Sequence, residues 1–319
     1  MKRRAIQLAK NTIVVSLPAK WVQQNSIVKG TELDIDVKER MLIVRKDAAA
    51  VASSLKASVD ISGMSSSLVW NYLNALYRAG FTEISISFSS MSIQDIKSGH
   101  SKKTMDVISR VTDKLIGMEI IMQSKNSCVL KEVTQLKGDE YSNVVNRIFL
   151  SIATTSKDTL SALREHDKET LENIYMYSEV NINKLSDYCM RILNIQGLDD
   201  FRGSNTNYLI TFLLEEVGDR YAMIAKAGAA DSKEDINRQA LDLLERTNSL
   251  VSLAHRFFLN PKKEHYVSFH DARNRLKKEA DALSLSKAKV DRELLFLIKS
   301  VLDKLMEVCN CQVTLTGFV

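Results

Sequence analysis

The sequence predicts a multidomain α+β protein, and three patterns along its 319 residues indicate this class. The first 48 residues contain short stretches of alternating apolar and polar residues, which are typical of strands. The following stretch, to about residue 134, alternates strand and helix patterns. From Tyr141 onward, apolar residues recur every three or four positions, which indicates helices that bury one face. We therefore expect three domains, over residues 1–48, 49–134 and 135–319.

The N-terminal domain is predicted to form two hairpins joined by a single helical turn. Strand patterns cover residues 4–9, 12–17, 32–37 and 41–45. Pro18 precedes a short helix over residues 19–24, and proline fits the first turn of a helix because that turn needs no bonded N–H. Four short strands bury little apolar surface, so this domain should dimerise or pack on another surface.

The middle domain is predicted to follow the order β-α-β-α-β-β. Strand patterns cover residues 55–61, 82–88, 119–123 and 128–131, and helical patterns cover 65–79 and 102–116. Serines at the start of the first helix can cap it, and Gly80 and Gly117 end the two helices. No glycine-rich nucleotide-binding motif accompanies these strands.

The C-terminal domain is predicted to be an all-helical bundle. Helical patterns cover about 141–163, 171–192, 205–228, 232–258, 264–284 and 288–309. Six helices in this order suggest two successive three-helix units.

The positive charge of the chain is concentrated at its N-terminus. Residues 1–48 hold ten Lys and Arg and five Asp and Glu, so this segment has a net charge of +5, the same as the whole chain. Such a patch is typical of proteins that bind nucleic acid, although basic residues on an edge strand also serve to prevent aggregation. Charge alone leaves both interpretations open.

Several classes of protein are not indicated. The sequence has no Ser-His-Asp grouping, nucleophile elbow or phosphate-binding loop, so we expect no enzyme activity. It has no apolar run long enough to span a membrane, so no membrane insertion is expected. The four cysteines form no recognisable disulfide framework, which fits a reducing cytoplasm.

The stretch LLEEVGDRYAMIAK contains the most specific acidic pattern. Glu215 and Asp219 are four residues apart, so both carboxylates should lie on one face of a helix, where a hard cation would relieve their repulsion. Two solvated surface acids are the alternative, and on spacing alone this alternative is favoured.

Two family resemblances bear on these patterns. The stretches SLPAKW, SIVKGTELDIDV and MLIVRK resemble the AbrB/SpoVT module, in which two chains interlace hairpins into a small swapped-hairpin β-barrel that binds DNA. The resemblance implies a homodimer through the N-terminal domain. It assigns DNA contacts to five basic residues of this domain, Lys2, Arg3, Arg4, Lys10 and Lys20.

EEVGD and the upstream stretch EVNINKLSDYCMR resemble the acidic helices of PhoU domains, which are built from two three-helix units and often hold iron or another metal. The resemblance implies a divalent or iron metal ion at Glu179, Glu215 and Asp219. The family usually has acids where this chain has Asn181 and Asn183.

Together these resemblances match archaeal PhoU-like regulators with an AbrB-like head. The implied function is a cytoplasmic, DNA-binding transcriptional regulator of phosphate uptake, whose bundle senses transporter state or metal. The alternative is an adaptor that does not bind DNA and docks on components of a phosphate ABC transporter.

Overall fold

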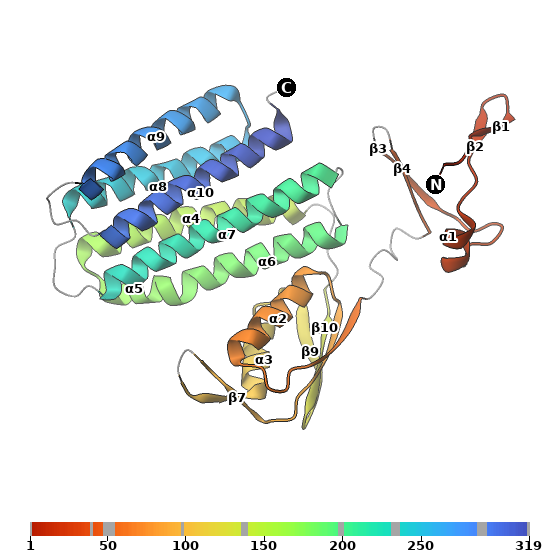
Figure 1. The fold of residues 1–319 in the computed structure, drawn as a ribbon, viewed down its shortest axis with the longest axis horizontal. Coiled ribbons are helices and arrows are strands. Elements are labelled where there is room, and N and C mark those ends of the chain that lie inside the picture. Colours follow the sequence, from red (N-terminus) through yellow and green to blue (C-terminus); the bar gives the residue numbers. More distant parts are fainter. Residues whose placement is uncertain are drawn as a thin grey trace. The chain divides into compact units, whose positions relative to one another are not determined.

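The computed structural model describes residues 2–38, 41–46, 55–96, 99–134, 140–196, 201–230, 237–285 and 292–317. The chain divides into two compact units, Met1–Ser53 and Ser54–Val319 (Figure 1). The α/β and helical parts that the sequence predicts both belong to the second unit.

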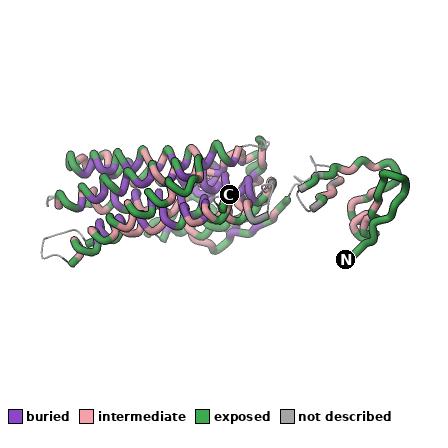
Figure 2. Tube along the Cα trace, turned by 90° about the horizontal axis from the view of Figure 1, so that it is seen from above, coloured by how far each residue is buried: buried purple, intermediate pink, exposed green. Residues whose placement is uncertain are grey.

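The first unit contains two antiparallel hairpins and one short helix. Strands β1 (Ile6–Ala9) and β2 (Thr12–Val14) form one hairpin, and β3 (Asp34–Lys38) and β4 (Met41–Arg45) form the other. Helix α1 (Ala19–Gln24) lies between them in sequence, after Pro18, and buries none of its residues. Most of this unit is exposed to solvent (Figure 2).

The closed barrel that we expected is not present in this single chain. Among the described residues, the two hairpins remain separate two-stranded sheets. The physical reason is visible on the second hairpin: Ile35 pairs with Val44 and Val37 with Leu42, so all four apolar side chains share one face. Ile35, Val37 and Leu42 are 59%, 76% and 64% exposed. In a single copy of the chain, the apolar face of this hairpin is thus largely uncovered.

The second unit begins with a four-stranded sheet of order β5-β6-β10-β9. Its strands are β5 (Lys56–Asp60), β6 (Glu83–Ser87), β9 (Met118–Ser124) and β10 (Ser127–Glu132). Strand β5 pairs in parallel with β6, and the other pairs are antiparallel. Helices α2 (Ser66–Arg78) and α3 (Thr104–Thr112) cover one face, where Ile84, Ile86 and Leu130 are buried (Figure 1). This is the predicted β-α-β-α-β-β order, and the sheet, α2 and α3 are called the α/β domain below.

A small additional hairpin lies between β6 and α3. It consists of β7 (Ser92–Gln94) and β8 (Ser101–Lys103). No pattern in the sequence predicted it, because its strands are three residues long and largely polar.

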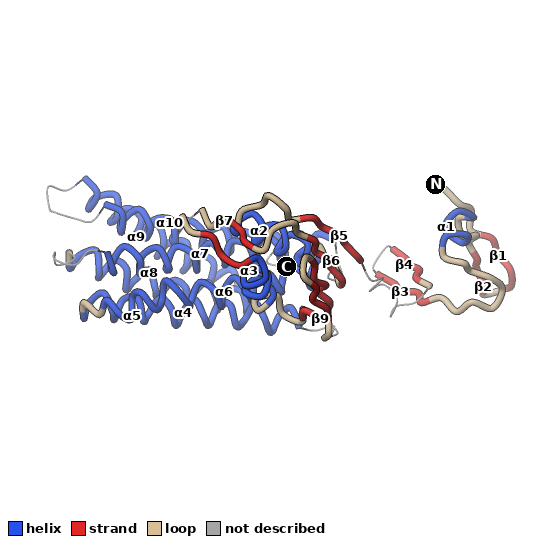
Figure 3. The backbone as a smooth tube through the Cα atoms, turned by 90° about the horizontal axis from the view of Figure 1, so that it is seen from below, coloured by secondary structure: helices blue, strands red, loops and turns tan. Residues whose placement is uncertain are grey.

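Helices form the rest of the second unit, and most of them are long (Figure 3). They are α4 (Glu140–Glu165), α5 (Lys168–Asn173), the π-helical turn η2 (Ile174–Ser178), α6 (Glu179–Gln196), α7 (Phe201–Ala230), α8 (Arg238–Leu259), α9 (Lys263–Leu285) and α10 (Arg292–Thr316). Helices α4, α6 and α7 pack against one another, as do α8, α9 and α10. Contacts of α7 with α10 and of α4 with α8 join the two sets into one bundle.

The bundle shares a single apolar core, drawn in purple in Figure 2. Helices α6 and α7 approach closely at Gly218, where a Cβ atom would lie 2.9 Å from Cδ1 of Ile182. Of the helices that the structure describes, none combines the length and the apolar character needed to cross a membrane.

Candidate functional site

Two regions contain the residues for which the sequence predicts a role. The first is the basic N-terminal unit. Lys2, Arg3, Arg4, Lys10 and Lys20 are all exposed. Arg3 and Arg4 precede β1, Lys10 lies in the β1–β2 turn, and Lys20 is in the first turn of α1. All five cations are therefore available to a polyanion.

The second region is a carboxylate cluster between α6 and α7. Asp187 on α6 is 4% exposed, and the side chain of Glu215 on α7 is 15% exposed. Asn183 lies one turn before Asp187, and Asp219 lies one turn after Glu215, so each helix contributes an i, i+4 pair. Helices α6 and α7 pack side by side, and Asp187 and Asp219 both lie close enough to Glu215 for their charges to act on it.

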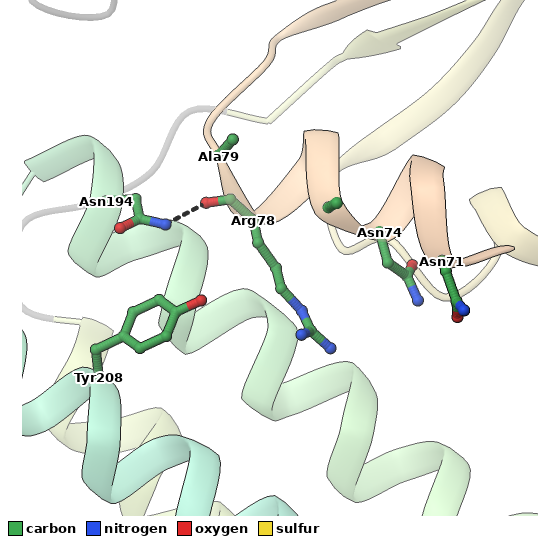
Figure 4. A pocket seen from close by; sticks show the side chains of 7 residues that line it. Asn71, Asn74, Arg78, Ala79, Asn194 and Tyr208 are labelled. Atoms are coloured by element: carbon green, nitrogen blue, oxygen red, sulfur yellow. Dashed lines mark hydrogen bonds between the residues drawn. The ribbon is translucent and has the colours of Figure 1, made fainter. Parts of the chain in front are cut away.

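An arginine from the α/β domain reaches into this cluster. Arg78 is the last residue of α2, and its Nε donates a hydrogen bond to Oδ1 of Asp187. Its Nη2 lies 3.6 Å from Oε1 of Glu215. The backbone of Arg78 is also held, because Nδ2 of Asn194 on α6 donates to its carbonyl oxygen at 2.7 Å (Figure 4). Arg78 therefore bridges α2 to both α6 and α7.

Opposing effects act on the pKa of Glu215 in this cluster. Burial raises the pKa of Glu215 to about 7, and the neighbouring charges of Asp187 and Asp219 add to this effect, while the guanidinium of Arg78 opposes it. Oε2 of Glu215 is buried and has no hydrogen-bond partner among the described residues. Glu215 thus changes charge close to neutral pH.

A second arginine makes the reciprocal connection, from α6 into the α/β domain. Arg191 is fully buried, and its Nη1 donates to the carbonyl oxygens of Tyr77 and Phe81 at 2.6 and 3.0 Å. Its Nη2 lies 3.1 Å from Oε1 of Glu132, and its guanidinium stacks over the ring of Tyr77. Two arginines, Arg78 and Arg191, therefore fix the α/β domain to the bundle.

A cavity of about 420 Å³ adjoins Arg78. It is lined by Asn71, Asn74, Ala75, Arg78 and Ala79 of α2, Asn194 of α6 and Tyr208 of α7 (Figure 4). Oδ1 of the buried Asn74 has no hydrogen-bond partner among the described residues.

The side chains of the cluster, as they lie, do not fit a metal ion. Glu215 and Asp219 share α7 as predicted, while Glu179 begins α6 with a side chain that lies outside the described residues. Within the described ranges, no group of three or more His, Cys, Asp or Glu side chains is arranged to hold a metal. The guanidinium of Arg78 instead occupies the position that faces both Asp187 and Glu215.

Three of the residues that matter here, Asp187, Arg78 and Arg191, had no predicted role in the site, although Arg191 ends the stretch EVNINKLSDYCMR that resembles a PhoU helix. Asp187 follows Asn183 at the same spacing that singled out Glu215 and Asp219, so a search for polar pairs could have found it. Arg78 and Arg191 carry no local signal of their contacts, because their partners come from other elements.

Among solved structures, one similar chain shares the helical part of the fold. The chain resembles the crystal structure of the phosphate transport system regulatory protein PhoU from Streptococcus pneumoniae, with a TM-score of 0.48 and 20% sequence identity. The match covers 56% of this chain and 94% of that chain. No family model matches the sequence. A search of curated proteins also finds no match.

Proposed function

We propose that this protein regulates phosphate uptake and that it acts by binding rather than by catalysis. The proposal is supported by the order of the parts: a basic N-terminal unit, an α/β domain, and a bundle of two three-helix sets. This is the order implied by the family resemblance of EEVGD and of SLPAKW in the sequence.

In one form of this function, the N-terminal unit binds DNA as a homodimer. The observation that carries it is the exposure of five basic side chains, Lys2, Arg3, Arg4, Lys10 and Lys20, on the same unit as an uncovered apolar hairpin face. A second copy would cover that face. It would also double the number of cations facing the phosphates, and phosphate contacts supply most of the affinity for DNA.

In the other form, the protein is an adaptor that does not bind DNA. Its bundle docks on components of a phosphate ABC transporter, and the N-terminal unit serves only to dimerise. The observation that favours this form is the bundle itself, which has one continuous apolar core and is joined to the α/β domain by arginine contacts.

Salt-dependent DNA binding distinguishes the regulator from the adaptor. Fluorescence anisotropy would follow the full-length chain on promoter fragments of phosphate-transport genes, at several salt concentrations and with unrelated DNA as competitor. For a DNA-binding regulator we expect selective binding with a steep salt dependence. Replacing Arg3 and Arg4 with alanine should reduce the slope by about 0.9 for each phosphate that is no longer neutralised.

A matched control removes the same charge elsewhere. Lys262 and Lys263, at the start of α9, are also exposed, and replacing both with alanine should leave the slope unchanged. Equal, weak binding of all fragments by the wild type would reject the DNA-binding regulator. Copurification with the transporter components would then support the adaptor.

A further inference from the structure

The carboxylate cluster of α6 and α7 has the composition of a cation site. Its donors are the carboxylate oxygens of three residues on two neighbouring helices: Asp187 on α6, and Glu215 and Asp219 on α7. Hard cations favour such oxygen donors. Three carboxylates held close together also need a positive charge nearby, since like charges in a partly buried site repel strongly.

The cation at this site is part of the protein. Arg78 donates to Asp187 and lies 3.6 Å from Glu215, and its side chain is 29% exposed. A guanidinium presents a planar fork of donors and remains charged at all relevant pH values, which makes it suited to partly buried carboxylates. A divalent ion placed between the same carboxylates would lie next to this positive charge, and the two cations would repel each other.

Arg78 also comes from a different layer of the protein. It ends α2, its carbonyl oxygen accepts a hydrogen bond from Asn194, and its side chain crosses to α6 and α7 (Figure 4). A metal ion would join only the two helices of the bundle, whereas Arg78 joins them to the α/β domain. The identity of the cation therefore determines which parts of the protein the site connects.

We propose that the guanidinium of Arg78 is the built-in cation of this site and fastens the α/β domain to the bundle, in the place where a metal would otherwise bind. The wild-type chain should hold no divalent ion between α6 and α7, and the attachment of α2 should depend on Arg78. This inference does not depend on the proposed function, because its tests require neither DNA nor a transporter.

The first test measures metal. Full-length protein is purified without chelator, its metal content is determined by mass spectrometry, and its melting temperature is recorded with EDTA and with MnCl2. We expect less than a stoichiometric amount of metal and the same melting temperature in both conditions. A stoichiometric metal ion whose removal by EDTA lowers the melting temperature would overturn the proposal.

The second test measures the attachment of α2 by hydrogen–deuterium exchange of the full chain. In Arg78→Ala, amides of α2 and of α6 near Asp187 should exchange at least about tenfold faster than in the wild type, because two partly buried carboxylates lose their partner. The control is Arg164→Ala, which removes an exposed arginine that pairs with Glu245 within the bundle. Exchange in Arg78→Ala that equals the control would overturn the proposal.

A second variant keeps the test decisive if Arg78→Ala does not fold. Arg78→Met combined with Asp187→Asn and Glu215→Gln removes the cation and both neighbouring charges together. This variant avoids uncompensated charge and still lacks the guanidinium bridge, so we expect exchange in α2 that is faster than in the wild type and slower than in Arg78→Ala. Wild-type protection of α2 in this variant would contradict the fastening role.

Discussion

Replacing Arg191 with methionine should lower the free energy of unfolding by about 3–5 kcal/mol. Arg191 lies in the contact between α6 and the α/β domain, and no part of it is exposed. Its guanidinium forms an ion pair with Glu132 at 3.1 Å and donates to the carbonyl oxygens of Tyr77 and Phe81. Methionine fills much of the volume of the arginine side chain but provides no donor. The change in stability therefore reports mainly the loss of the polar contacts.

The magnitude follows from the groups that lose their partners. The carbonyl oxygen of Tyr77 keeps a second donor, the N–H of Gly80 at 3.0 Å, so losing the guanidinium costs this group little free energy. The carbonyl of Phe81 and the carboxylate of Glu132, 15% exposed, lose the guanidinium. A buried polar group without a partner costs about 1–3 kcal/mol, and a charged group costs more. The two together give the range stated above.

Urea unfolding followed by circular dichroism tests this estimate. We expect the midpoint of Arg191→Met to fall clearly, and addition of Glu132→Gln to restore about 1–2 kcal/mol, because a neutral amide is less costly to bury than a carboxylate. The control is Arg246→Ala, which removes an exposed ion pair with Glu279 and should change stability by less than about 1 kcal/mol. A loss of stability in Arg191→Met no larger than in this control would show that the buried contacts of Arg191 contribute little.

Three further predictions concern the bundle. Burial raises the pKa of Glu215 in the folded protein to about 7, above its ordinary value of 4.5, so the folded state binds the proton more tightly than the unfolded state. Stability should therefore fall by up to about 3 kcal/mol as pH rises from about 4.5 to above 7. Burial also raises the pKa of Asp187, so Glu215→Gln should reduce this slope in urea midpoints without removing it, and equal slopes in the variant and the wild type would contradict the prediction. Gly218→Ala should destabilise by about 1–3 kcal/mol, because the new methyl group would lie 2.9 Å from Ile182, and an unchanged melting temperature would argue against this close packing. Burial lowers the pKa of His255, whose ring stacks on Phe149, so the folded state resists protonation of this ring. Stability should therefore fall as pH drops below about 6.5, and His255→Asn should weaken this loss. An equal loss of stability in the variant and the wild type would assign the acid sensitivity to other groups.

Local patterns predicted most of the secondary structure. The helix over residues 19–24 and the strand over 41–45 have the predicted bounds, since proline and alternating apolar residues act within a few positions. The predicted helix over 171–192 contains the π-helical turn η2, which no spacing in the sequence indicates. Helix α10 continues to Thr316, beyond the expected end near residue 309.

The candidate site was only partly predictable, because the sequence patterns describe neighbours within a few positions and not contacts between distant segments. Glu215 and Asp219 lie on one helix, so their spacing alone places them on one face. The position of Arg78 depends on how α2 packs against α6 and α7, which is a tertiary contact between distant segments. Spacing alone favoured two solvated acids, the family resemblance implied a metal ion, and neither could indicate an arginine from a distant helix at this position.

The proposed role in the regulation of phosphate uptake can be tested in a deletion strain. Uptake of radiolabelled phosphate and transcript levels of the phosphate transporter would be measured in low and high phosphate, with and without a plasmid that restores the wild-type chain. We predict that deletion abolishes the difference between the two conditions and that the plasmid restores it. An unchanged response of both uptake and transcripts in the deletion strain would contradict the account.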